Sequence, residues 1–398
     1  MPRFEPFAGL RYSLAHVGSL DAVVCPPYDV IDDDEREVLL SRSAYNVVRL
    51  ELPVAPGHDA AGSTPYEGAA ALLDSWRDGG VLARDHEPAF YGYRMQSTDD
   101  SGAVRSTVGV IGALVLEAPG RGILPHEETT PKAKSDRLQL LRALRVNTSP
   151  IWALTARTGL ADLAGDPVQP AAHTVADGVV HELWPITDPA KVAAIRELVG
   201  AEPVLVADGH HRYETGLAYH REAGGGPEGS GAVMALVVEL DDTQLAVQAI
   251  HRVVSGVGAA ELLEVLGRHF TLTPSGAPDA GVLGRMREAG ALAVVTAEGT
   301  WLAEPTATTT AAATHDLDSS RLDVALADLP DADVRYQHGW DLAAGAVTAG
   351  TAAAAVLLRP ATVAQIAAIS RGGVRMPPKT TFFWPKPRTG MVLRELAG

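Results

Sequence analysis

The run Asp208-Gly-His-His-Arg212 gathers the side chains of this sequence that are best suited to chemistry. The apolar run 204–207 before it predicts a short buried strand, and the apolar spacing from Tyr213 onward predicts a helix. A strand, a tight glycine turn and a helix start place unpaired backbone N–H groups and a positive dipole beside cationic side chains. This combination indicates an anion site, with phosphate as the expected anion. Asp208 could hold a metal ion or orient a hydroxyl group.

A second reactive group lies in the segment 123–137. A helix is expected from about Pro131 to Leu144, so a loop precedes it, with the side chains His126, Glu127, Glu128, Thr129 and Thr130. A carboxylate beside an imidazole could act as a general base, and either glutamate fits this role. The same residues also fit a plain helix cap, because threonine caps helices and acids suit a helix N-terminus. The zinc-protease helix pattern is absent, since no second histidine follows His126 by four residues.

Two further segments could contribute to a pocket. Cys25-Pro-Pro-Tyr-Asp29 is a rigid approach in which Tyr28 and Asp29 either line a pocket or form a turn before a capped helix. Near the C-terminus, three aromatic residues lie between prolines and basic side chains. We expect this segment to pack into the core, with Lys379, Lys386 and Arg388 facing anions, and a purely structural role is the alternative.

Composition narrows the classes of function. Lys plus Arg number 33 against 49 Asp plus Glu, a net charge of -16, which argues against nucleic-acid and anionic-membrane binding. The single cysteine, Cys25, precludes an intrachain disulfide and is expected to be a buried structural thiol. The N-terminus lacks the apolar region of a signal peptide, and no apolar run approaches the ~20 residues of a membrane helix. A cytoplasmic protein is therefore expected.

The elements around these residues are mixed. Alternation predicts a strand at Val47–Leu52 and an antiparallel pair at 89–95 and 107–116, and the segment 306–314 is expected to be a surface strand or loop. Adjacent His210 and His211 would point different ways from a helix start, so a zinc ion held by both is not expected.

We expect three regions: an N-terminal α/β region at 1–120, a core carrying both reactive segments at 121–223, and a C-terminal α/β region at 232–398. The glycine-rich stretch 224–231 is the main break.

The two reactive segments together resemble a known pattern. Pro125-His-Glu-Glu128 followed by Asp208-Gly-His-His-Arg212 is similar to the free L-serine kinases of the ParB/sulfiredoxin-like superfamily, with a longer insertion between the two segments here. Over nearly its whole length the chain also resembles a bacterial and archaeal family of unknown function with the sequence Asp-Gly-His-His-Arg-Tyr-Glu-Thr, here at 208–215. The resemblance implies an α+β fold: a ParB/sulfiredoxin-like nucleotide-binding core with large mixed-sheet insertions and an additional α/β lobe.

The resemblance implies phosphoryl transfer from ATP or ADP, with Mg²⁺, to the hydroxyl of a small substrate, free L-serine above all. The implied catalytic residues are Glu127, Asp208 and His211, with Asp208 also the metal ligand and Glu128 the substitute base. Phosphates would contact Gly209, His210, His211, Arg212 and Lys379. Substrate would contact His126, Glu128, Thr129, Thr130 and Arg137.

Several alternatives stay open. The chain could be a ParB-like nucleotide-binding and hydrolysing switch that lacks kinase activity, or a binding protein with the same pocket and no turnover. The oligomeric state is left open, with a homodimer among the alternatives, and so are the roles of His251 and Arg252.

Overall fold

The computed structural model describes residues 1–54, 64–98, 104–118, 120–125, 131–167, 169–226, 228–241, 243–279, 281–371, 376 and 379–396. These residues form a mixed α+β protein with several sheets and 14 helices. The chain falls into two compact units, which are described separately. Unit 1 takes in Met1–Pro125, Thr129–Leu245 and Pro385–Gly398, and unit 2 takes in Ala246–Trp384.

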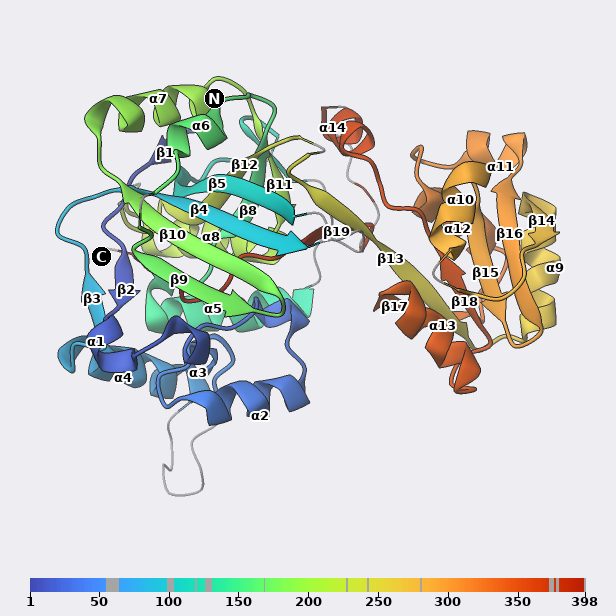
Figure 1. Cartoon of the computed structure of the whole chain (residues 1–398), viewed down its shortest axis with the longest axis horizontal. Coiled ribbons are helices and arrows are strands. Elements are labelled where there is room, and N and C mark those ends of the chain that lie inside the picture. Colours follow the sequence, from blue (N-terminus) through green and yellow to red (C-terminus); the bar gives the residue numbers. More distant parts are fainter. Residues whose placement is uncertain are drawn as a thin grey trace. The chain divides into compact units, whose positions relative to one another are not determined.

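Unit 1 is built on a nine-stranded sheet of the order β6-β11-β8-β12-β5-β4-β10-β9, with β1 paired to β5 (Figure 1). Its strands are β1 (Phe4–Glu5), β4 (Phe90–Thr98), β5 (Val104–Val115), β6 (Ile123–Pro125), β8 (Ile151–Thr155), β9 (Ala172–Ala176), β10 (Val179–Ile186), β11 (Val204–Asp208) and β12 (Ala232–Glu239). Two small sheets join β2 (Leu10–Tyr12) to β3 (Leu82–Arg84) and β7 (Val146–Asn147) to β20 (Arg394–Glu395). The last pair ties the C-terminal segment into unit 1.

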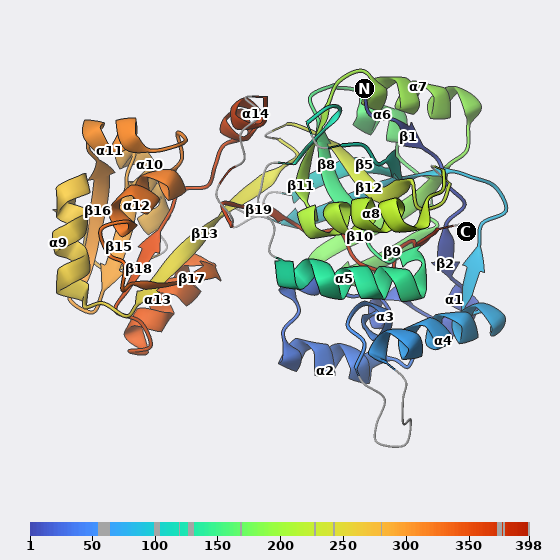
Figure 2. The ribbon, with the colours of Figure 1, turned by 180° about the vertical axis from the view of Figure 1, so that it is seen from behind.

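The helices of unit 1 are α1 (Leu14–Val17), α2 (Asp33–Arg42), α3 (Val48–Glu51), α4 (Pro65–Asp78), α5 (Pro131–Leu144), α6 (Leu160–Ala164), α7 (Pro189–Gly200) and α8 (His210–Ala223). Helices α6 and α7 lie on one side of the unit and α2 to α4 on the opposite side, while α5 runs beside α8 (Figure 2). Side chains of α6, α7 and α8 share one buried cluster with the central strands of the sheet. Burial of this apolar surface is the main force that holds α8, and so the reactive turn, in place.

Unit 2 is a seven-stranded antiparallel sheet of the order β14-β16-β15-β18-β13-β17, with β19 paired to β13. Its strands are β13 (Ala246–Ser255), β14 (Phe270–Pro274), β15 (Leu292–Thr296), β16 (Gly299–Pro305), β17 (Asp333–His338), β18 (Ala354–Leu357) and β19 (Thr381–Trp384). Its helices are α9 (Ala259–His269), α10 (Val282–Ala289), α11 (Ala307–Ala312), α12 (Asp318–Leu326), α13 (Trp340–Thr348) and α14 (Val363–Arg371).

Both faces of the unit 2 sheet are covered by helices. Leu292 and Val294 of β15 pack in a cluster with α9 and α12, whereas Ala293 and Val295 pack in a second cluster with α10 and α13. Successive residues of a strand point to opposite faces, so a strand that is apolar throughout needs cover on both sides.

Most of the expected elements are found, and two are not. The strand, turn and helix around Asp208 appear as β11 and α8, the helix at Pro131 appears as α5, and the antiparallel pair appears as β4 and β5. The strand expected at Val47–Leu52 is wrong, because the backbone N–H groups of Leu50 and Glu51 both donate to the Val47 carbonyl oxygen and close the short helix α3 instead. The segment 306–314 contains helix α11, whose first turn is capped by Thr306.

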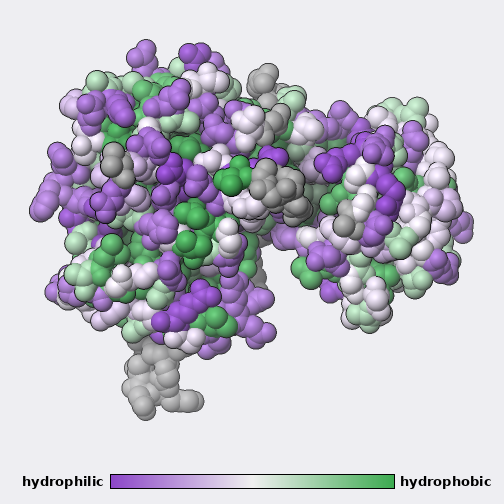
Figure 3. Space-filling view, viewed as in Figure 1, coloured by the Kyte–Doolittle hydropathy of each residue, from purple (hydrophilic) through white to green (hydrophobic). Residues whose placement is uncertain are grey.

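Among the described residues, no helix is long and apolar enough to cross a membrane. In the space-filling view, hydrophilic side chains predominate on the face shown, and hydrophobic ones are scattered among them (Figure 3).

Cys25 is buried, as expected, and burial raises the pKa of its thiol well above the usual value. It therefore has the properties of a structural thiol.

Candidate functional site

The turn between β11 and α8 is the centre of the candidate site. Asp208 ends β11, and its pairing with β8 shifts register between Val206 and Asp208, which re-aims the side chain at the strand end. Gly209 follows with φ +89°, a left-handed conformation that glycine adopts without strain. A Cβ atom at Gly209 would lie 3.0 Å from Ile151 Cγ2 and 3.1 Å from Arg212 Nε. Glycine thus allows both the turn and the close approach of Arg212.

Arg212 fastens the start of α8 to the neighbouring strand. Its Nη1 atom donates to Ser149 Oγ at 2.9 Å and to the Pro150 carbonyl oxygen at 2.6 Å, just before β8. Its Nη2 atom donates to Asp208 Oδ2 at 2.8 Å, one helical turn back. The Nε atom is buried and has no hydrogen-bond partner among the described residues. The guanidinium group is therefore held rigidly, with its Nε–H group still unused.

Lys386 brings the C-terminal segment into the same site. Its Nζ atom forms an ion pair with Asp208 Oδ1 and lies 3.4 Å from Asp29 Oδ2. The Lys386 side chain is only 9% exposed. Two carboxylates, from the short 3-10 helix Tyr28–Val30 near the N-terminus and from β11, therefore converge on one buried ammonium group.

The charges set the protonation state of the site. Burial alone would raise the pKa of Asp208, but Lys386 and Arg212 outweigh it and hold that pKa far below the usual range. Burial likewise opposes the charged form of Lys386, and Asp208 and Asp29 reverse this and raise the pKa of Lys386. Asp208 is thus a firmly ionised carboxylate, which suits the binding of cations and makes it a weak proton acceptor.

A second layer of side chains lies beside this cluster. The Arg137 guanidinium carbon is 4.5 Å from the centre of the Tyr28 ring, and Nη1 donates to the Glu51 carbonyl oxygen at 2.8 Å. Two bonds to Asp136 Oδ2, of 2.8 Å and 2.6 Å, fix the other side of the guanidinium. Burial raises the pKa of Tyr28 to about 12, so its phenol stays protonated. Arg137 is a buried, well-anchored cation.

A cavity of about 50 Å³ is lined by residues of α5 and α8. Its polar lining includes Glu51, Arg137, Thr148, Ser149 and Arg212, and Thr148 Oγ1 donates to Glu51 Oε2. Thr215 Oγ1 also lines it and has no hydrogen-bond partner among the described residues. The space is too small for a nucleotide and large enough for one or two small polar groups.

The structure brings some of the predicted residues together. Asp208, Gly209, His210, His211 and Arg212 are contiguous at the start of α8, and His210 is buried. Arg137 lies in the adjoining layer. Lys379 belongs to unit 2, with φ +57°. The remaining predicted residues, His126, Glu127, Glu128, Thr129 and Thr130, lie outside the described residues.

Three contributors had weaker signals in the sequence. Asp29 fits equally well as a turn residue, Glu51 lies in a segment that alternates like a strand, and Lys386 is one of several basic residues in the C-terminal segment. The signal that could identify Lys386 is its place between prolines in an aromatic stretch, which predicts a buried segment and hence a buried, paired lysine.

The residues with open roles in unit 2 have structural contacts. His251 Nδ1 accepts a 3.1 Å hydrogen bond from the Leu358 N–H group, and burial lowers the pKa of His251 to about 4. The Arg252 guanidinium lies 4.5 Å from the centre of the Tyr336 ring. Both residues therefore stabilise the β13 region of the sheet.

The carboxylates also bear on metal binding. Within the described ranges, no group of three or more His, Cys, Asp and Glu side chains is placed to hold a metal ion. Asp29 and Asp208 nevertheless reach one cation, the Lys386 ammonium. Proteins hold Mg²⁺ through one or two carboxylates together with substrate phosphates, so this pair fits Mg²⁺ when a nucleotide completes the shell.

Comparison with known proteins places the chain in a family. A family model described as "Protein of unknown function (DUF1015)" matches residues 4–325. The chain belongs to this family. The curated proteins contain no match.

Several solved structures are similar to parts of the chain. A conserved hypothetical protein from Pyrococcus furiosus is 13% identical, with 67% of this chain and 88% of that chain covered and a TM-score of 0.36. A free serine kinase in complex with AMP is 15% identical, with 69% and 90% covered and a TM-score of 0.37. SbnI from Staphylococcus aureus, with a C-terminal truncation, is 16% identical, with 70% and 85% covered and a TM-score of 0.37.

Proposed function

We propose that this protein transfers a phosphoryl group from ATP or ADP to the hydroxyl of a small substrate, with free L-serine as the substrate and O-phosphoserine as the product. The observation that carries the proposal is the position of Asp208 between Arg212 and Lys386 at the start of α8. A helix start with two buried cations and an ionised carboxylate provides positioning and charge neutralisation, and these are the main needs of phosphoryl transfer.

In this proposal the nucleotide phosphates lie at the N-terminus of α8. The backbone N–H groups of Gly209, His210 and His211 and the free Nε of Arg212 would donate to phosphate oxygens. Lys386 would move from its carboxylate partners toward the phosphates. Mg²⁺, when bound, supplies positive charge that offsets the negative charge of the phosphates. Asp208 and Asp29 would be its protein ligands.

The proton acceptor in this proposal is Glu127. Asp208 is a poor candidate because its paired carboxylate has a strongly lowered pKa. The serine hydroxyl oxygen forms a new bond to the terminal phosphorus atom, and the bond from that phosphorus to its bridging oxygen breaks. The electron pair of the broken bond stays on the departing nucleotide, and the hydroxyl proton passes to Glu127, or to Glu128 if the register differs by one residue. His211 would contact the transferring group.

The substrate contacts complete the proposal. Arg137 is an anchored cation that could bind the carboxylate of the amino acid, together with Thr129 and Thr130. His126 and Glu128 would contact its amino end.

The corresponding fold proposal is a ParB/sulfiredoxin-like core at 121–223, flanked in the sequence by α/β regions at 1–120 and 232–398. The phosphate-type turn between β11 and α8 supports this proposal.

The test is a phosphoserine-formation assay with ATP, ADP, CTP and pyrophosphate as separate donors, each with L-serine and Mg²⁺. We expect O-phosphoserine with ATP or ADP, and loss of product when Arg212 is changed to Gln, while the exposed control Glu87→Gln retains the rate. Tight nucleotide binding with no phosphoserine from any donor would contradict the kinase and favour a ParB-like nucleotide-dependent switch.

A further inference from the structure

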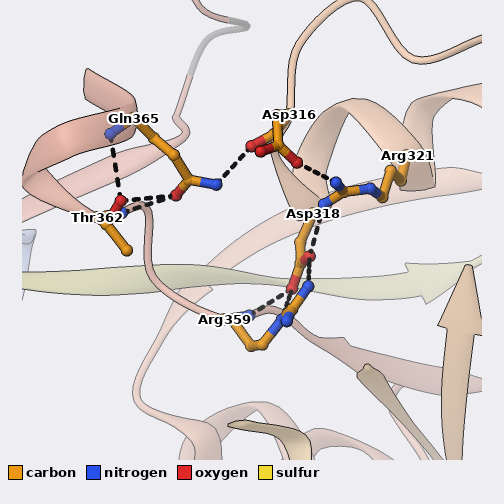
Figure 4. Close-up of polar contacts among 6 residues, drawn as sticks. All are labelled: Asp316, Asp318, Arg321, Arg359, Thr362 and Gln365. Atoms are coloured by element: carbon orange, nitrogen blue, oxygen red, sulfur yellow. Dashed lines mark hydrogen bonds and ion pairs between the residues drawn. The ribbon is translucent and has the colours of Figure 1, made fainter. Parts of the chain in front are cut away.

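Unit 2 contains a cavity of about 540 Å³ that none of the preceding roles uses. It lies between the starts of α12 and α14, beside the end of β18 (Figure 4). Three arginines line it, Arg287, Arg321 and Arg359, together with the carboxylates of Asp316 and Asp318. All of its lining residues belong to unit 2. A volume of this size is typical of a site for a small metabolite.

Arg359 is a fixed part of the cavity wall. Its Nε and Nη2 atoms donate to the two oxygens of Asp318 at 2.9 Å and 2.6 Å, and its backbone N–H donates to Asp318 Oδ2 at 2.9 Å. Such a two-pronged pair sets both the position and the plane of the guanidinium group. The loop after β18 is thereby pinned to the first turn of α12.

Arg321 is held differently and keeps an unused donor. Its Nη2 atom pairs with Asp316, and its Nη1 atom lies 3.4 Å from Asp318 Oδ1. The side chain is 9% exposed, yet its Nε atom is buried with no hydrogen-bond partner among the described residues. A buried donor without a partner is costly, and a ligand oxygen would remove that cost.

The charge balance of the cavity is positive. Two carboxylates, Asp316 and Asp318, face Arg321 and Arg359, and Arg287 adds a third guanidinium. The Nε atom of Arg287 donates to the Leu283 carbonyl oxygen at 3.3 Å. In a chain with a net charge of -16, a concave site with excess arginine is selective for an anion.

The remaining walls indicate what the anion is attached to. Thr362 and Gln365 form a reciprocal cap at the start of α14, and Gln365 Nε2 donates to the Asp316 carbonyl oxygen at 2.6 Å. The polar side chains of these two residues therefore already have hydrogen-bond partners within the protein. Apolar surface is supplied by Leu317, Leu358 and Pro360. A lining that combines arginines with apolar side chains favours a ligand with an anionic head and an apolar body.

We propose that this cavity binds a small organic oxyanion, a molecule that carries a phosphate or carboxylate group on an apolar body. Arg321 and Arg287 contact the anionic group, and Arg359 holds the wall in place. The site is independent of the kinase reaction, because no residue is shared with the cluster around Asp208.

The experiment is calorimetric titration of the full chain with phenyl phosphate, with benzoate and with uncharged benzyl alcohol. We expect at least one of the two anions to bind with a dissociation constant of about 1 mM or tighter, and benzyl alcohol at least tenfold more weakly. The stronger of the two anions identifies the head group. If neither anion binds, or if the alcohol binds as tightly, the proposal is wrong.

Variants locate the binding. Arg287→Ala and Arg321→Gln should each weaken the bound anion about tenfold, the effect of losing one charge-assisted contact. Arg268→Ala, which removes an exposed arginine of α9, should change the dissociation constant less than twofold. Arg287 is exposed and its replacement should leave the melting temperature unchanged, so the test stands even if Arg321→Gln unfolds the protein. Equal weakening by Arg268→Ala would overturn the assignment.

Discussion

Lys386 and Asp208 are 178 positions apart in the chain, and their side chains form a largely buried ion pair within unit 1. The pair depends on the return of the C-terminal segment to unit 1. This return is fixed by the pairing of β20 with β7 and by the backbone hydrogen bonds of an antiparallel β-bridge between Cys25 and Thr389. The candidate site is therefore assembled from the two ends of the chain as well as from the β11–α8 turn. Loss of the C-terminal segment would leave Asp208 with Arg212 alone.

The first prediction concerns the stability contributed by this pair. Lys386→Met should lower the free energy of unfolding by about 3 kcal/mol, because it leaves the Asp208 and Asp29 carboxylates without their buried cation. Chemical unfolding measures this change, with the exposed Lys191→Met as the control, which should stay within about 0.5 kcal/mol of the parent. A similar loss of unfolding free energy in both variants would show that the ion pair does not stabilise the protein.

The second prediction concerns the turn. Gly209→Ala should destabilise the protein more than Gly178→Ala, although φ is positive at both, +89° and +73°. An alanine at Gly178 meets nothing within 4 Å and should cost about 1 kcal/mol for its backbone alone. At Gly209 the new Cβ also crowds Ile151 and Arg212, so the cost should be larger and nucleotide binding should weaken. Equal unfolding midpoints for the two variants would contradict the close approach of Arg212.

The third prediction concerns pH. His181 is buried, with Nδ1 2.9 Å from the Tyr93 hydroxyl, and burial followed by the charge of Arg388 lowers the pKa of His181 to about 3. The unfolded chain binds this proton at an ordinary pKa of about 6.5, so unfolding is favoured as the pH falls below that value. The free energy of unfolding should fall by up to about 1.4 kcal/mol per pH unit from this group alone. The fall should continue to about pH 3.

Thermal or chemical unfolding at several pH values measures this dependence. His181→Gln should flatten it between pH 6.5 and 3, whereas the exposed His86→Gln should leave the slope unchanged. An identical slope for His181→Gln and the parent would mean that His181 is not held in its neutral form.

The fourth prediction concerns Arg212. Arg212→Lys keeps the charge but cannot reproduce the three donated bonds to Ser149, Pro150 and Asp208. We expect nucleotide affinity to fall about tenfold to a hundredfold, which equilibrium binding of ADP measures directly. Unchanged affinity would show that this guanidinium does not contact the phosphates.

The sequence predicts the local parts of the site and fails on its long-range parts. The β11–α8 turn and the start of α5 follow from apolar spacing, glycine and proline, which act over a few residues. The strand expected at α3 fails because Val47, Val48 and Leu50 are all buried, so alternation carries no information there. The backbone forms a helical turn instead, in which the N–H groups of Leu50 and Glu51 donate to the Val47 carbonyl oxygen.

Lys386 illustrates the harder case. Its partners, Asp29 and Asp208, are fixed by the topology of the whole unit, and no local rule gives the register that brings the C-terminal segment to the end of β11. The sequence therefore predicts that Lys386 faces anions, but it does not identify Asp29 and Asp208 as those anions.

The central claim is phosphoryl transfer to free L-serine, and its most direct test is the stoichiometry of nucleotide consumption. ATP or ADP is incubated with Mg²⁺, with and without L-serine, and the nucleotide and O-phosphoserine are quantified together for the parent, for Glu127→Gln and for the exposed control Glu87→Gln. The account predicts one O-phosphoserine for each nucleotide consumed, no consumption without serine, and loss of turnover in Glu127→Gln alone. Nucleotide consumption that is the same with and without serine, and that yields no O-phosphoserine, would contradict it.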